Sequence, residues 1–159
     1  MKKVITTIVI VGMLSVITWI PGLLLFGLQV GLAGGWWFLA NWTLGAGMVI
    51  GFLLWLLVLS LVAMASSVYV KWRVVAGAVS LAFFFLLTGV TEMIEQVFRA
   101  TWAHVLDPAW AVNRVWCTLL GVDPPAGPGA AACTVSLAAF ILLLGLVIER
   151  KLRPVEVVR

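Results

Sequence analysis

Residues 66–77 read SSVYVKWRVVAG, a short basic turn between two long apolar runs. Residues 4–70 contain no Asp, Glu, Lys, Arg or His, and a second uncharged run covers residues 74–91. Lys71 and Arg73 lie on either side of a tryptophan in this turn. Such a turn is typical of a cytoplasmic hairpin of a membrane protein, because cations stay on the inner face and tryptophan prefers the headgroup region. The other segments can therefore be oriented from it.

The composition is that of a membrane protein. Apolar residues make up 64% of the 159 residues and charged residues only 10%, and the mean hydropathy is +1.21. A soluble domain usually contains about 25% charged residues. The net charge of +4 does not indicate nucleic-acid binding, because the basic residues follow membrane sidedness and do not gather on a polar face. We therefore expect one all-α transmembrane domain covering residues 1–159.

The apolar runs predict four transmembrane helices, at about residues 4–28, 43–66, 74–91 and 130–148. The first run is too long for the apolar core of a signal peptide, which is about 7–15 residues. Residues 29–42 are uncharged and rich in Gly and Trp, so they predict an outer connection at headgroup depth. Residues 47–51 read GMVIG, a GxxxG motif that lets a neighbouring helix approach closely.

Residues 92–129 predict an outer interfacial segment between the third and fourth spans. Glu92, Glu95 and Arg99 follow one another at helical spacing, so the third helix is expected to continue as an amphipathic piece. Glu95 and Arg99 have the i,i+4 spacing of a helical ion pair. One or two short interfacial helices should follow before a Pro- and Gly-rich turn. Residues 149–159 form the predicted cytoplasmic tail.

The distribution of charge supports this topology. With both termini in the cytoplasm, eight of the ten basic residues lie inside: Lys2, Lys3, Lys71, Arg73, Arg150, Lys151, Arg153 and Arg159. The outer connections hold only two basic residues against four acidic ones. This arrangement follows the positive-inside rule, in which Lys and Arg accumulate in cytoplasmic loops. It predicts an integral protein of a bacterial inner membrane.

The sequence contains no catalytic or cofactor motif. A metal site would need His104, the only histidine, together with Glu92, Glu95 or Asp107, and nothing fixes these groups at ligand spacing. Walker, dinucleotide-binding and nucleophile-elbow patterns are absent. We therefore expect no metal, no cofactor and no enzymatic activity in this chain.

The candidate functional residues each have two interpretations. Glu92, Glu95 and Arg99 form either a solvated outer face or a gate of a translocation path, since ionisable groups at membrane depth often face a water-filled cavity. The basic turn and tail either set the topology and attract anionic lipid or bind a cytosolic partner. Cys117 and Cys133 are either two small apolar side chains or a disulfide.

The order of parts resembles the later part of an ABC-2 type transporter permease. The turn SVYVKWRVVAG joins two spans, and the segment TEMIEQVFRATW carries a span into short outer helices. The Pro-rich return DPPAGPG precedes the last span, and the tail reads ERKLRPVEVVR. The resemblance covers nearly the whole chain.

This resemblance implies a permease component that pairs with a second permease subunit and a cytosolic ATP-binding subunit, which would hydrolyse the ATP. The turn residues implied to contact the ATP-binding subunit are Tyr69, Lys71, Trp72 and Arg73. By the same analogy, Glu92, Glu95 and Arg99 belong to an outer gate. Such permeases usually have six spans, and this chain supplies the last four. It is then a fragment, one product of a split gene, or a subunit whose missing helices come from a partner.

Two other functions fit the same sequence. The chain could be a small structural or assembly subunit of another integral membrane complex. It could also be a membrane-embedded enzyme that acts on a lipid through Glu92, Glu95 and His104. The bound partners distinguish the first alternative, and alanine substitutions distinguish the second.

Overall fold

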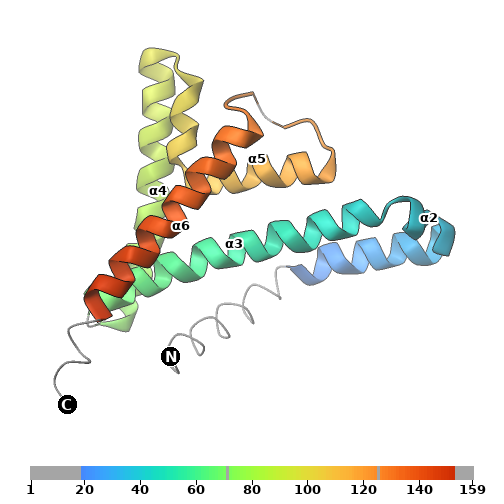
Figure 1. Ribbon diagram of the computed structural model, residues 1–159, viewed down its shortest axis with the longest axis horizontal. Coiled ribbons are helices and arrows are strands. Elements are labelled where there is room, and N and C mark those ends of the chain that lie inside the picture. The colour runs from blue at the N-terminus through green and yellow to red at the C-terminus, as the bar shows by residue number, and fades with distance from the viewer. Residues whose placement is uncertain (1–18, 71, 125, 153–159) are drawn as a thin grey trace.

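The computed structural model describes residues 19–70, 72–124 and 126–152, which form helices and turns and no strand. In chain order the helices are Trp19–Ala33, α2 (Gly35–Ala40), α3 (Trp42–Tyr69), α4 (Arg73–Phe98), η1 (Thr101–Leu106), α5 (Pro108–Leu120) and α6 (Ala130–Leu152) (Figure 1). The element η1 is a 3₁₀ helix, and the others are α-helices.

Within the described residues, three helices are long and apolar enough to cross a membrane. They are Trp42–Tyr69, Val74–Phe98 and Ala130–Lys151. Their lengths of 28, 25 and 22 residues exceed the roughly 20 residues that span a hydrocarbon core. The described residues confirm the all-helical fold, and these three helices are compatible with the predicted membrane spans. The predicted first span, residues 4–28, lies partly outside the described residues.

The predicted outer connection, residues 29–42, is mostly helical. The first helix continues to Ala33 and ends there because Gly34 adopts a φ of +85°, a conformation that favours glycine. The six-residue helix α2 then leads directly into α3. The residues predicted to form an outer connection therefore make a helical hairpin tip, in which Trp36 is 83% exposed.

The GxxxG motif on α3 is the contact point of another helix, as predicted. A Cβ atom added to Gly47 would lie 3.0 Å from the carbonyl oxygen of Leu119. One added to Gly51 would lie 2.6 Å from the indole of Trp116. Both neighbours belong to α5, so the helix that uses this close approach lies within the same chain.

The chain reverses its direction after α4. As expected, α4 continues past the predicted span to Phe98, where Arg99 adopts the left-handed conformation with a φ of 50°. The short helices η1 and α5 then fold back, and Figure 1 shows α5 in the opening between α3 and α4. The core joins α3, α5 and α6 through Val58, Ala111, Val112, Cys133 and Leu137. Hence α5 belongs to the packed interior and is not a detached surface helix.

The helices α3 and α4 diverge from the turn at residues 70–72, and α6 ends beside this turn (Figure 1). The ammonium group of Lys151 lies 5.3 Å from the ring centroid of Tyr69. The basic turn and the start of the basic tail thus lie at the same end of the helices. The assignment of this end to the cytoplasm remains a prediction from the charge distribution.

Candidate functional site

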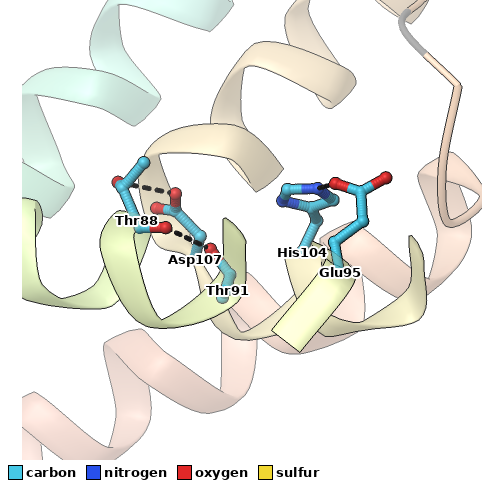
Figure 2. A network of polar contacts seen from close by, with 5 residues as sticks. All are labelled: Thr88, Thr91, Glu95, His104 and Asp107. Atoms are coloured by element: carbon cyan, nitrogen blue, oxygen red, sulfur yellow. Dashed lines mark hydrogen bonds and ion pairs between the residues drawn. The ribbon is translucent and has the colours of Figure 1, made fainter. Parts of the chain in front are cut away.

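A cluster of polar side chains connects α4 to the returning segment (Figure 2). Its members come from the second half of α4, from η1 and from the residue that precedes α5, and they are Thr88, Thr91, Glu95, His104 and Asp107. Three of them are buried: Thr91 is 1% exposed, Asp107 2% and His104 8%. Buried polar groups are costly unless they are hydrogen-bonded, so their partners decide what this cluster does.

Asp107 ties the start of α5 to α4. Its Oδ1 accepts a hydrogen bond of 2.9 Å from the amide of Ala109, which makes Asp107 the N-cap of α5, and Pro108 occupies the first turn of that helix. Its Oδ2 accepts a hydrogen bond of 2.8 Å from the hydroxyl of Thr88 on α4. The carboxyl group of Asp107 therefore accepts a hydrogen bond from a free backbone amide at the start of α5 and also links α5 to α4.

The imidazole of His104 is held from two sides. Its Nε2 lies 2.6 Å from Oε2 of Glu95 on α4, which is the length of a strong hydrogen bond or ion pair. Its ring stacks on the indole of Trp110 with a centroid distance of 5.0 Å and an interplanar angle of 16°. The guanidinium of Arg114 lies 6.0 Å from the centroid of the same indole. The returning segment is thus attached to α4 at a second point.

The indole of Trp110 also fixes the loop that precedes α6. A Cβ atom added to Gly127 would lie 2.7 Å from this ring, so only glycine permits the observed approach. A second bond reaches α6 itself, because the hydroxyl of Ser136 donates to the carbonyl oxygen of Val105 in η1. Together with the polar cluster, these contacts hold η1, α5 and the start of α6 on the side of α4.

The three predicted gate residues do not come together as expected. Glu95 contacts His104 and not Arg99, because α4 ends at Phe98 and the i,i+4 pairing requires a helix that continues through residue 99. Glu92 and Arg99 are exposed. The proposed Glu95–Arg99 ion pair is therefore wrong, and Glu95 belongs to the polar cluster.

The predicted contact residues for an ATP-binding subunit lie at the other end of the helices. Tyr69 is 62% exposed and Trp72 is 75% exposed. Arg73 is the first residue of α4, and Lys71 lies outside the described residues. Both described aromatic side chains are therefore accessible for a contact.

Sequence reasoning missed Thr88 and the role of Asp107. The dipeptide Asp107-Pro108 carries a usable signal, because Asp at the N-cap followed by Pro at the first helical position predicts the start of a helix. Nothing in the sequence indicates that η1 turns back and brings this carboxyl group to Thr88. The two cysteines are free thiols, with Cys133 buried and Cys117 half-buried, so they form no disulfide with each other.

The chemistry of the cluster is that of a structural connection. Among residues 19–70, 72–124 and 126–152, no three His, Cys, Asp or Glu side chains converge in a way that could hold a metal ion. The ring nitrogen Nδ1 of His104 is buried without a hydrogen-bond partner. The carboxyl oxygens of Asp107 are used by Thr88 and Ala109. What this arrangement does is fix the position of η1 and α5 on α4.

Two cavities of the described residues lie beside α3 and α5. One has a volume of about 530 Å³ and lies between the first described helix and α3, with a lining that includes Phe26, Phe38 and Trp42. A smaller one of about 170 Å³ lies beside α5 and is lined by Trp55, Ala109, Val112, Asn113 and Trp116.

Comparison of the sequence and the structure with family models, with curated proteins and with solved structures found no match.

Proposed function

We propose that this chain is a transmembrane subunit of an ATP-driven transporter of the ABC-2 permease type. It would assemble with a second permease subunit or another partner that supplies further helices, and with a cytosolic ATP-binding subunit. In this proposal the protein lies in a bacterial inner membrane with both termini in the cytoplasm. The three apolar helices support the membrane part of the proposal. The composition of the outer face of α4 supports the part that requires a second membrane subunit.

The outer face of α4 has the composition of a helix–helix contact. A stripe of exposed residues recurs at intervals of four and three along the side opposite to the buried one: Ala78, Ala82, Phe85, Gly89, Glu92 and Gln96. A face that meets only lipid chains gains nothing from small or polar residues. Small residues let helices approach closely in a membrane, and polar side chains join them by hydrogen bonds. This stripe is the observation that carries the part of the proposal that requires a second membrane subunit.

Glu92 makes the case for a partner stronger. It precedes the end of α4 at Phe98 by six residues, which corresponds to about 9 Å along a helix axis. Its carboxylate is exposed on the face that carries Ala78 and Ala82. An ionisable side chain near the edge of the hydrocarbon core is stable when it faces water or a polar partner. A second subunit on this face would place Glu92 and Gln96 along a shared, hydrated contact, as a gate requires.

The polar cluster gives this gate a mechanical basis. Because Thr88 and Glu95 fasten the returning segment to α4, a movement of α4 would carry η1 and α5 with it. ATP binding would close the cytosolic subunits against the turn at Tyr69 and Trp72. The transporter would then shift its population between inward and outward states.

Co-purification tests the proposal. The tagged chain, extracted in mild detergent from its native membrane, should retain an ATP-binding subunit, and the double variant Tyr69→Ala/Trp72→Ala should lose it. A cysteine placed at Ala82 should cross-link to a second membrane subunit. A cysteine at Leu142, which is 68% exposed on α6, serves as the matched control. Recovery of the chain without any ATP-binding protein, under conditions that preserve the Ala82 cross-link, would contradict it.

The alternative is a small structural or assembly subunit of another integral membrane complex. The same stripe on α4 favours this role equally, since it indicates a helix partner without indicating transport. Cofactor-bearing partners in the co-purified complex would identify this alternative.

A further inference from the structure

The turn between α3 and α4 and the last turn of α6 form one basic and aromatic surface. The ammonium group of Lys151 lies 5.3 Å from the ring centroid of Tyr69. This cation–π contact joins two segments that are far apart in the sequence and places a cation beside the turn. Arg150 precedes Lys151 in the last turn of α6, and Trp72 follows Tyr69 closely in the turn. We call these four residues the basic–aromatic surface.

The surface is open in the described part of the chain. Trp72 is 75% exposed and Tyr69 62%, and the side chains of Arg150 and Lys151 are also exposed. Glu149 is the only acidic residue of α6, so the last turn of this helix is net positive. In the sequence, Lys71 and Arg73 add two further cations on either side of Trp72.

We propose that the basic–aromatic surface binds the phosphate headgroup of an anionic phospholipid. The surface lies where three apolar helices end, which is the depth of the lipid headgroups for helices that cross a bilayer. An exposed indole is stable at this depth, because its apolar ring and its N–H group suit a layer that is neither hydrocarbon nor water. Neighbouring cations attract anionic lipids at the same depth.

The contact between Lys151 and Tyr69 distinguishes this surface from scattered basic residues. A free lysine side chain has many rotamers, and ordering it on a ligand costs conformational entropy. The ring of Tyr69 restricts the ammonium group before the lipid arrives, so part of this ordering is already complete. Lys151 and Arg150 then approach one phosphate from α6, and Trp72 covers the adjoining glycerol region from the turn. This inference does not depend on the proposed transport function.

Native mass spectrometry of the purified full-length chain tests this site. The probes are phosphatidylglycerol and phosphatidylcholine with identical acyl chains, so only the headgroup differs between them. The wild-type chain should bind phosphatidylglycerol more tightly. Each cation removed should weaken this binding about five-fold, so the double variant Arg150→Gln/Lys151→Gln should weaken it about twenty-five-fold. Binding of phosphatidylcholine should stay unchanged.

A matched pair of substitutions at Tyr69 tests the preorganisation. Tyr69→Phe keeps the aromatic ring and should retain the preference for phosphatidylglycerol. Tyr69→Leu removes the ring at similar size and should lower the affinity for this lipid about two- to five-fold, the range of an exposed cation–π contact. This result supports the site because both variants leave the charge of the surface unchanged.

Several outcomes would overturn the inference. One is an unchanged preference for phosphatidylglycerol in the Arg150→Gln/Lys151→Gln variant. Another is an equal loss of both lipids, which would show that the headgroup is not recognised. A third concerns the same Arg150→Gln/Lys151→Gln variant in the co-purification experiment. If this variant keeps its preference for phosphatidylglycerol but loses the ATP-binding subunit, the surface binds an acidic protein partner and not a lipid. Equal affinities of the Tyr69→Phe and Tyr69→Leu variants would remove the role of the cation–π contact.

Discussion

The hydrogen bond between Thr88 and Asp107 should contribute measurably to the stability of the fold. The hydroxyl of Thr88 donates to Oδ2 of a carboxyl group that is 2% exposed, over a distance of 2.8 Å. Side-chain hydrogen bonds between membrane helices contribute about 0.6 kcal/mol on average and up to about 1.7. Hydrogen bonds to charged groups reach about 1.5–3 kcal/mol. We therefore expect Thr88→Val to lower the free energy of unfolding by about 1–2 kcal/mol.

Asp107→Ala should be more destabilising, because it also removes the N-cap of α5. Loss of the hydrogen bond from the Ala109 amide adds about 1 kcal/mol, so the total should be about 2–3 kcal/mol. In the double variant the hydrogen bond to Thr88 is already lost, and only the cap remains to be removed. The coupling free energy between the two sites should therefore be about 1–2 kcal/mol.

The coupling can be measured by reversible unfolding of the four proteins in mixed detergent micelles with increasing dodecyl sulfate. Thr91→Val is the matched control, because the hydroxyl of Thr91 donates to the carbonyl oxygen of Thr88 within α4 and does not reach Asp107. It should show no coupling with Asp107→Ala. Strict additivity of Thr88→Val and Asp107→Ala would refute the idea that this bond fastens α5 to α4.

The other predictions concern packing, attachment and topology. Gly51→Ala should lower the free energy of unfolding by about 1–3 kcal/mol, because the new Cβ atom would lie 2.6 Å from the indole of Trp116 on α5. Gly89→Ala is the control, because its new Cβ atom meets nothing within 4 Å. This variant should be neutral or stabilising in the same unfolding assay. Glu95→Gln keeps a hydrogen bond to η1 but loses the charge. The backbone amides of η1 should therefore exchange hydrogen several-fold faster, as measured by hydrogen–deuterium exchange mass spectrometry. An unchanged exchange rate would contradict the attachment of η1 to α4 through Glu95. Single cysteines at positions 72 and 151 should react with a membrane-impermeant reagent from the same side of the membrane. Labelling from opposite sides would contradict the conclusion that the basic turn and the start of the tail lie at the same end of the helices.

The apolar helices and one of their contacts could be predicted from the sequence because both depend on local patterns. Long uncharged runs must be helical in a bilayer, where every backbone amide needs an internal partner. The spacing of Gly47 and Gly51 puts two residues without side chains on one face, so it predicts a close approach. The pattern does not indicate which helix approaches, and the structure assigns that place to α5.

The polar cluster could not be predicted because it depends on where the chain changes direction. The spacing of Glu95 and Arg99 suggested a pair only on the assumption that the helix continues. Arg99 instead adopts a left-handed conformation, for which its sequence gives no signal. This single residue turns the chain, and the turn brings His104 to Glu95. The contacts of the cluster are thus consequences of tertiary structure and not of local spacing.

The two faces of α4 differ in what they contact. Its buried face is fastened to the returning segment through Thr88 and Glu95, so on this side the helix has its partners within the chain. Its outer face carries small residues and the exposed carboxyl group of Glu92, which a lipid environment does not satisfy. In the proposed assembly, the internal attachment would hold α4 in place while its outer stripe contacts another subunit, and a cross-link from position 82 is the most direct measurement of that contact.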